Sequence, residues 1–196
     1  MKKPQLDQTV KFMKFLHAFQ LVERIMHVPN VERNENDAEH SYSLAMLAWY
    51  LIDSLDLKLD KQKVFEYCLT HDLVEIYAGD TYFLDEKAKE TKAVREKEAQ
   101  LQIEREFPEF VSLHPTITKY ELQQDPESIF VHSLDKLAPV LTNFIMEGRT
   151  WKAVGVAFKD LLENKRNKIQ EGSEVMDLFE QIIVIIEKDP LKYFPK

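Results

Sequence analysis

The stretch Leu69-Thr-His-Asp-Leu-Val-Glu-Ile-Tyr-Ala-Gly-Asp80 dominates the sequence because it sets ionisable side chains into an apolar run. Those side chains are His71, Asp72, Glu75 and Asp80. A buried carboxylate without a partner costs several kcal/mol, so such groups usually become neutral, form ion pairs or bind a metal. The stretch therefore predicts a site of chemistry inside the fold.

The same stretch has a helical setting. Asp60 is typical of an N-cap, and a helix that starts there reaches His71. If the helix continued, Glu75 would lie one turn after His71, and Asp72 would lie about 100° round the axis. We expect the three side chains along one edge of a helix.

Apolar residues recur at helical steps of three and four along most of the chain, which predicts an all-α fold. One stripe runs from Phe12 to Met26, and another from Leu44 to Ile52. Asp125-Pro126 is typical of an N-cap and a first helical residue, and predicts a helix through Ile145. The charge-rich segment 86–106 predicts a solvated amphipathic helix, and 182–186 a buried helix rather than a strand.

Breaks at Pro108, Pro115 and Gly148 are interpreted as turns between helices, and the sequence has no internal repeat or low-complexity tract. With 196 residues and 44% hydrophobic content, the chain is long enough for one sizeable core. We expect residues 1–196 to form a single-domain bundle of about seven or eight helices.

Charge and glycine content exclude some classes of function. The formal net charge is -8 and the pI is about 5.3, so no excess of positive charge exists to neutralise a polymeric nucleic acid. A small phosphorylated substrate remains compatible, because one cation and a few basic side chains reverse the potential locally. The four glycines form no G-x-G-x-x-G or Walker loop, which argues against a glycine-rich nucleotide cradle.

The chain has the composition of a cytoplasmic protein. Cys68 is the single cysteine, which excludes an intrachain disulfide, and the start Met-Lys-Lys-Pro-Gln lacks the apolar segment of a secretory signal. The longest strongly apolar run, 182–186, is far shorter than the roughly 20 residues that cross a bilayer. We therefore expect no membrane role.

Two more polar residues fall on apolar helix faces. His40 shares its helical row with Leu44, and Asp135 lies between Leu134 and Leu137. A lone inward histidine is more often a core imidazole bonded to a carbonyl, but a buried Asp needs a partner. Native cores rarely bury this many ionisable groups, so the companions favour a shared cation.

This set of residues resembles a known family. The order His40, His71-Asp72 and then Asp135 resembles the HD-domain superfamily of metal-dependent phosphohydrolases. Within this superfamily, roughly residues 15–145 of the chain resemble the bacterial 5'-deoxynucleotidase branch. Its remaining elements are Arg24, the segment Asn34-Glu-Asn-Asp-Ala-Glu-His-Ser41 and the spacing from His71 to Asp80. The resemblance implies the HD-type helical fold, a homodimer and one divalent metal bound by His40, His71, Asp72 and Asp135.

The ligand types limit the metal. Two imidazoles and two carboxylates suit Mn, Fe, Co, Ni or Zn better than Ca, and Mg remains compatible. Four protein ligands alone would make a closed tetrahedral zinc site, whereas a six-coordinate ion would keep two positions for water and a phosphate oxygen. The resemblance favours the open, catalytic arrangement.

The reaction expected from the resemblance is hydrolysis of a (deoxy)nucleoside 5'-monophosphate to nucleoside and phosphate. Glu75 is expected to orient the attacking water or take its proton, and Asp80 to protonate the leaving 5'-oxygen, or the reverse. The competing interpretations are a partner of a ligating histidine for Glu75 and a turn residue after Gly79 for Asp80.

Arg24 matches the family position that contacts the substrate phosphate, although most arginines are simply exposed. The next residue in that branch is a Trp associated with sugar recognition, whereas this chain has Ile25, so the preference for deoxyribose stays open. Thr81 and Tyr82 are expected at the mouth of the site, where a hydroxyl would bond sugar or phosphate. The alternative for Thr81 is an ordinary loop residue.

Cys68 is interpreted as a small buried hydrophobe. The remaining histidines are interpreted as structural or exposed: His17, His27, His114 and His132.

Two alternatives remain. The first is an HD phosphohydrolase of another nucleotide bond, such as a triphosphate or ppGpp; a cyclic dinucleotide is disfavoured because a second His pair and a Gly-Tyr-Pro element are absent from the sequence. Product identification separates these cases. The second is a non-catalytic helical module in which the metal only stabilises the core, and metal removal should unfold such a module.

Overall fold

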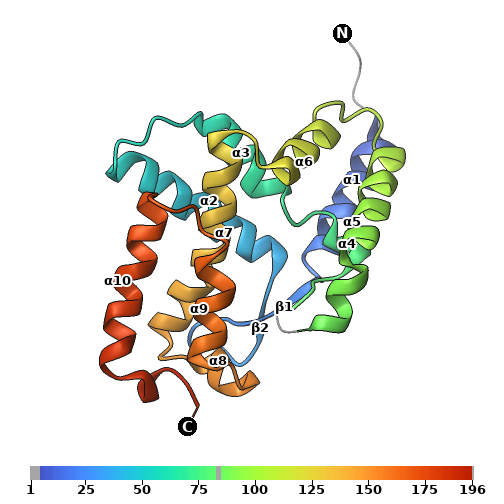
Figure 1. The fold of residues 1–196 in the computed structure, drawn as a ribbon. Coiled ribbons are helices and arrows are strands. Elements are labelled where there is room, and N and C mark those ends of the chain that lie inside the picture. Colours follow the sequence, from blue (N-terminus) through green and yellow to red (C-terminus); the bar gives the residue numbers. More distant parts are fainter. Residues whose placement is uncertain (1–4, 83–84, 196) are drawn as a thin grey trace.

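The computed structural model describes residues 5–82 and 85–195, which form an almost entirely helical molecule (Figure 1). Its elements are α1 (Leu6–Phe19), β1 (Glu23–His27), β2 (Asn34–Asn36), α2 (Asp37–Ser54), α3 (Lys61–Thr70), α4 (Glu75–Ala78), α5 (Glu86–Glu106), α6 (Leu113–Leu122), α7 (Pro126–Ile145), α8 (Arg149–Val154), α9 (Phe158–Arg166), α10 (Glu174–Lys188) and the 3-10 turn η1 (Pro190–Lys192). The all-α prediction is confirmed, with short helices α4 and α8 and one hairpin added to the longer helices.

Several helices begin and end where the sequence predicts. Asp125 accepts a hydrogen bond from the Ser128 backbone as the N-cap of α7, whose first residue is Pro126 and whose last is Ile145. Asp60 caps α3 in the same way. Helix α5 covers the predicted segment 86–106, and α10 contains the apolar run 182–186 as a helix.

The prediction of a helical stripe from Phe12 to Met26 is wrong at its C-terminal end. Helix α1 stops at Phe19, and Met26 lies on strand β1. The strand pairs with β2 in antiparallel register. Met26 is buried, and the Asn143 amide donates to its sulfur at 3.2 Å. Tertiary packing has therefore converted the last part of a helical pattern into a hairpin, which places Arg24 beside the start of α2.

The helix expected to carry the dominant stretch is interrupted. Helix α3 ends at Thr70 and α4 begins at Glu75. Between them the backbone makes the tighter i to i+3 hydrogen bonds, from Leu73 to Thr70 at 3.2 Å and from Glu75 to Asp72 at 2.9 Å. Pro115 is also not an interhelical break, since it lies in the first turn of α6, where its missing N–H is tolerated.

The described residues form two hydrophobic clusters, and the dominant stretch crosses from one to the other. The larger cluster contains buried residues of α2, α3, α7 and α10, including Cys68. The smaller cluster contains buried residues of α1, α4, α5 and α6, including Leu73 and Val74. Figure 1 shows α1, α4 and α5 on one side of the molecule and α7, α9 and α10 on the other. His71 and Asp72 therefore lie at the boundary between two packed regions.

None of the described helices combines the length and the apolar character needed to cross a membrane.

Candidate functional site

The four predicted metal ligands come together in the structure. His40 lies in the first turn of α2, His71 and Asp72 follow α3, and Asp135 lies in the middle of α7. One ligand atom of each lies within 4.8 Å of the ligand atoms of the others. Two atoms bound to one ion at about 2.1 Å are at most about 4.2 Å apart, so only a small contraction would let one ion reach all four.

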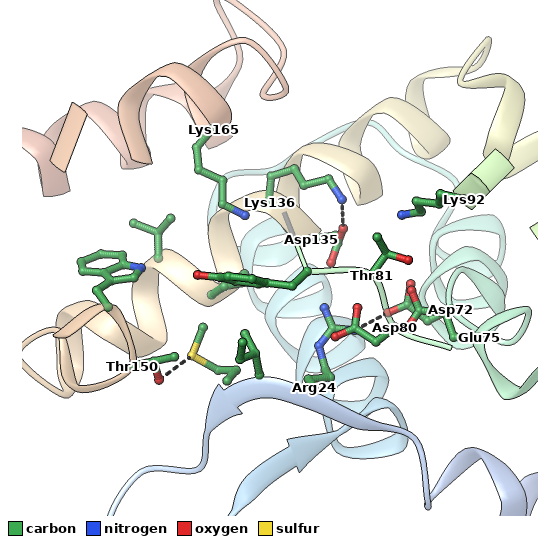
Figure 2. A pocket seen from close by; sticks show the side chains of 16 residues that line it. Arg24, Asp72, Glu75, Asp80, Thr81, Lys92, Asp135, Lys136, Thr150 and Lys165 are labelled. Atoms are coloured by element: carbon green, nitrogen blue, oxygen red, sulfur yellow. Dashed lines mark hydrogen bonds and ion pairs between the residues drawn. The ribbon is translucent and has the colours of Figure 1, made fainter. Parts of the chain in front are cut away.

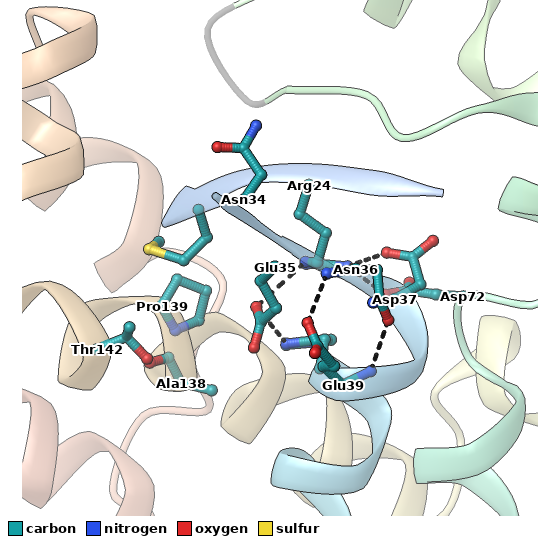
Figure 3. A network of polar contacts seen from close by, with 12 residues as sticks. Arg24, Asn34, Glu35, Asn36, Asp37, Glu39, Asp72, Ala138, Pro139 and Thr142 are labelled. Carbon is teal, nitrogen blue, oxygen red and sulfur yellow. Dashed lines mark hydrogen bonds and ion pairs between the residues drawn. The ribbon is translucent and has the colours of Figure 1, made fainter. Parts of the chain in front are cut away.

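The start of α2 is fixed by a capping box. The Asn36 side chain accepts from the Glu39 backbone N–H at 3.0 Å, while the Glu39 carboxylate accepts from the Asn36 backbone N–H at 3.3 Å (Figure 3). Arg33 holds the same carboxylate with two further bonds. Because His40 directly follows Glu39, this cap sets the position of the imidazole.

His71 is prepared as a metal ligand. Its Nδ1 lies 3.0 Å from the Cys68 carbonyl oxygen, which only accepts, so Nδ1 carries the hydrogen. The opposite nitrogen, Nε2, is buried, makes no hydrogen bond and faces the Asp72 carboxylate at 2.9 Å. A carbonyl that orients the ring in this way is the usual outer partner of a ligating histidine. The residues present fit a cation between the His71 imidazole and the carboxylates.

His40 and Asp135 face each other across the cluster. The His40 Nε2 lies 2.9 Å from Asp135 Oδ1, and its Nδ1 lies 3.6 Å from a Glu35 oxygen. Burial and Arg24 favour the neutral ring, but the hydrogen bonds with the two carboxylates raise the pKa of His40 to about 8. Lys136 donates to the second Asp135 oxygen at 2.5 Å and helps hold the pKa of this buried carboxyl well below its ordinary range. The carboxylate is thus kept charged and available as a ligand.

Arg24 points from β1 into the cluster instead of into solvent. Its Nη1 donates to Asp72 at 2.6 Å and to Asp37 at 3.0 Å, and Nε lies 3.9 Å from Glu35 (Figure 3). The guanidinium and His71 help keep Asp72 ionised against the cost of burial, so the pKa of this carboxyl is far below its ordinary value. Arg24 is therefore not one of the many exposed arginines, since its side chain is 15% exposed, and it lies on strand β1.

Glu75 is a buried acid beside other acids. Its Oε2 is buried and makes no hydrogen bond. Burial, together with Asp72, Asp80 and Asp37, raises the pKa of Glu75 to about 10. Asp37 shares this environment, and burial with the charge of Asp72 raises its pKa to about 6. The Glu75 carboxyl group therefore retains a proton at neutral pH until a cation or another proton acceptor changes its surroundings.

The turn after α4 presents the next predicted residues. Gly79 ends the helix with a positive φ of 74°, and Asp80 and Thr81 follow it. Arg95 of α5 donates to the Ala78 carbonyl and, at 2.8 Å, to the Thr81 hydroxyl. Burial raises the pKa of Asp80 despite the opposing charge of Arg24. Thr81 is therefore held by the protein, while Asp80 lines the site as an acid with a raised pKa.

A cavity opens beside the cluster and has two different ends (Figure 2). Its volume is about 840 Å³ when the open solvent at its mouth is included. We call one end the charged end; it is lined by Arg24, Asp72, Glu75, Asp80, Lys92, Asp135 and Lys136. We call the other the apolar end; it is lined by Met26, Val140, Thr150, Trp151 and Lys165. We call the remaining lining residues the intermediate wall; they are Ile25, Thr81, Tyr82 and Pro139.

Sequence reasoning missed four of the charged groups in this region. Asp37 lies on the first residue of α2, a position where an acid normally serves the helix terminus. Lys92, Lys136 and Lys165 line the cavity, although lysines usually lie in solvent. The only available signal was Lys136 directly after the buried Asp135. Conversely, Cys68 is a buried core thiol as predicted, and the other histidines lie outside the cavity lining: His17, His27, His114 and His132.

The sequence of this chain is similar to that of known proteins along most of its length. The profile of the HD-domain family matches residues 18–177. The 5'-deoxynucleotidase HDDC2 of Homo sapiens is 33% identical over 135 residues, covering 64% of this chain and 65% of the human protein. The 5'-deoxynucleotidase hdd1 of Schizosaccharomyces pombe is 28% identical over 123 residues, covering 60% of this chain and 61% of the yeast protein. The matches span just under two thirds of the length of these relatives.

The fold is similar to two solved structures. The crystal structure of a predicted metal-dependent phosphohydrolase from Magnetospirillum magnetotacticum MS-1 has a TM-score of 0.82 and 29% sequence identity, covering 97% of this chain and 96% of that chain. A conserved hypothetical protein from Pyrococcus furiosus has a TM-score of 0.59 and 19% identity, covering 91% of this chain and 99% of that one. The second likeness concerns the fold alone.

Proposed function

Because this chain belongs to the HD-domain family, we propose that it is a metal-dependent phosphomonoesterase that hydrolyses nucleoside 5'-monophosphates to nucleoside and inorganic phosphate. The observation that carries the proposal is the position of two ligands: Asp72 and Asp135 line the cavity together with Arg24, Glu75 and Asp80. A metal that only stabilised the core would need neither access to a cavity nor further carboxylates beside its ligands. The names of the curated relatives support the choice of substrate.

One divalent cation is proposed as the cofactor, held by His40, His71, Asp72 and Asp135. The buried Nε2 of His71 and the ionised state of both aspartates suit this role. Mixed nitrogen and oxygen ligands favour Mn, Fe, Co, Ni or Zn over Ca, and Mg is compatible. When bound, the ion supplies positive charge that polarises a phosphate oxygen and lowers the pKa of water.

Arg24 is proposed to bind the substrate phosphate. Only one of its two terminal nitrogens is engaged with Asp72 and Asp37, so the fork can present further N–H donors to the cavity. A guanidinium held on two sides loses little freedom when it binds phosphate, and this preorganisation favours the extended charge of the transition state. Arg24 thus fixes the phosphate against the acids of the charged end.

Glu75 and Asp80 are proposed as the proton-transfer pair. Glu75 lies one turn of chain after the ligand Asp72, where its carboxylate would orient the attacking water and take its proton once local positive charge has lowered its pKa. Asp80 has a raised pKa in a buried position, which suits a group that donates a proton to the leaving 5'-oxygen. The reverse division of labour uses the same two groups and gives the same products.

The apolar end is proposed to hold the nucleoside. A phosphate placed between Arg24 and the ligand cluster leaves the sugar beside Ile25, Thr81 and Tyr82 on the intermediate wall. The base then reaches the apolar end. Ile25 provides packing for the sugar but no indole hydrogen bond, so we expect a weaker preference for deoxyribose than a Trp at this position would give.

Phosphate release from metal-stripped protein tests the proposal. Ribo- and deoxyribonucleoside 5'-monophosphates are supplied with Mn, Co, Zn or Mg added back, and nucleoside and phosphate are quantified. We expect equal amounts of both products and no activity without metal. Release of pyrophosphate or triphosphate from other nucleotides, with no activity on monophosphates, would instead assign the site to a different phosphate bond.

A further inference from the structure

Lys165 lines the apolar end of the cavity and is not one of the residues proposed to bind the metal. It is a buried residue of α9, 8% exposed, and its side chain points into the cavity on the side of Thr150 (Figure 2). Asp72, Glu75 and Lys92 lie on the opposite side in the same view. In this view the Lys165 nitrogen lies beside Lys136, away from Asp72, Glu75 and Lys92.

The basic groups of the charged end are bonded to the acids of the cluster. Arg24 is bonded to Asp37 and Asp72, and Lys136 is bonded to Asp135. These contacts hold both cations beside the cluster, where the proposed function places the phosphate. A substrate fixed there extends its nucleoside toward α8 and α9, so the base is the part of the substrate that comes nearest to Lys165.

We propose that Lys165 is a specificity-determining residue that donates a hydrogen bond to a carbonyl oxygen of the nucleobase. This inference rests on the proposed function. An ammonium group has three N–H donors and no acceptor, so it matches O6 of guanine or a carbonyl of thymine or uracil. Adenine places an amino donor where guanine has O6, and two opposed donors in a buried site leave both unsatisfied. The enzyme should therefore prefer bases that carry carbonyl groups over adenine.

The surroundings of Lys165 strengthen such a contact. Burial, with a smaller contribution from the positive charge of Lys136, lowers the pKa of Lys165 to about 7. Near neutral pH Lys165 therefore exchanges between its neutral amine and its ammonium form, and an acceptor on the substrate would favour the ammonium form by a charge-assisted hydrogen bond. Met26 and Trp151 are buried at the same end of the cavity, and the Thr150 hydroxyl lies 3.5 Å from the Met26 sulfur.

Steady-state kinetics with three substrates test the inference. We would measure kcat/KM for dGMP, dTMP and dAMP with the full chain and with Lys165→Met, which keeps the stem and removes the donor. Lys165→Gln keeps N–H donors, and Lys159→Met removes a lysine that is exposed on the same helix. We expect Lys165→Met to lose about tenfold on dGMP and dTMP and little on dAMP. Lys165→Gln should retain part of the preference, and Lys159→Met should retain all of it.

A role in folding would lower all three rates together and leave their ratio unchanged, so the ratio is the decisive readout. Equal losses on the three substrates, or no change in any, would overturn the assignment of Lys165 to the base while leaving the phosphomonoesterase intact. Absence of hydrolysis of every monophosphate by the unaltered protein would overturn the proposed function, and the inference with it. Thermal unfolding of each variant identifies any that fails to fold, in which case the glutamine variant carries the test.

Discussion

The two ends of the cavity are built by different physical means. At the charged end, acids and basic side chains hold one another by ionic hydrogen bonds, as His40 and Lys136 hold Asp135. At the apolar end, Val140 and Trp151 pack in the larger hydrophobic cluster. Met26 is buried, and its sulfur contacts Asn143 at 3.2 Å and Thr150 at 3.5 Å. Removing one member of a buried charge pair leaves the other uncompensated, whereas an apolar wall tolerates a change of shape.

This difference predicts separate consequences for the two ends. Changes at the charged end should lower turnover strongly and equally for all substrates. Changes at the apolar end should alter the ratio between substrates while turnover of the best one changes little. The distinction between the two ends would be wrong if a change at one end produced the effect expected of the other.

Metal removal should have the largest effect. Chelation followed by dialysis is expected to lower turnover by about a thousandfold or more, because the positive charge at the phosphate is lost. Circular dichroism should show that the helices remain, since two hydrophobic clusters persist without the ion. Activity should return when Mn or Co is added. Loss of helical signal on chelation would show instead that the ion mainly stabilises the fold.

Asp72→Ala is expected to lower turnover of every substrate by about a thousandfold, because it removes a proposed ligand and a partner of Arg24. Metal content measured by mass spectrometry should fall with it. Asp53→Ala is the matched control, since Asp53 is an exposed carboxylate on α2 that pairs with Lys61. A variant of Asp72 with unchanged activity and full metal content would remove this residue from the site.

Glu75→Gln should lower turnover by about a hundredfold while it stabilises the metal-free protein. The folded-state pKa of about 10 lies above the ordinary value of 4.5. The folded protein therefore favours the protonated Glu75. The stability that this protonation contributes is fully present below pH 4.5 and is lost as the pH rises toward about 10. The glutamine is always neutral, so the Tm difference in its favour should grow from pH 5 to pH 8. An exposed control, Glu90→Gln, should show no such trend.

Ile25→Trp should have the smallest effect on turnover and a clear effect on preference. Ile25 lines the intermediate wall of the cavity. A larger aromatic side chain there is expected to raise the deoxyribose-to-ribose ratio of kcat/KM by several-fold, which is the effect of about 1 kcal/mol. Competition between paired dAMP and AMP substrates measures this ratio directly. An equal loss of kcat/KM on dAMP and AMP would show that Ile25 affects turnover and not the choice of sugar.

The sequence predicted the charged end better than the apolar end for a physical reason. His71, Asp72 and Asp135 stand out because ionisable groups are costly on apolar helix faces. Met26, Val140 and Trp151 do not stand out, since an apolar residue beside a cavity has the same pattern as one in the core. Lys165 was equally hidden, because a lysine near a helix end is usually solvated.

The fold shows the same division. Helices with caps, such as α7 after Asp125, were predicted to the residue because the cap is a local signal. The hairpin at 23–36 and the turn after Thr70 could not be predicted, since each depends on contacts with distant segments. The side chain of Arg24 reaches Asp72 only because the chain leaves its helix at Phe19.

The order of the site residues along the chain has an evolutionary consequence. The charged end is complete once the chain has reached Lys136, whereas Thr150, Trp151 and Lys165 follow it. Under the proposed function, mutation and recombination in the last quarter of the gene can therefore change which nucleotide is accepted while the residues of the charged end stay the same. Relatives that share the same ligands are expected to diverge in substrate mainly through α8 and α9.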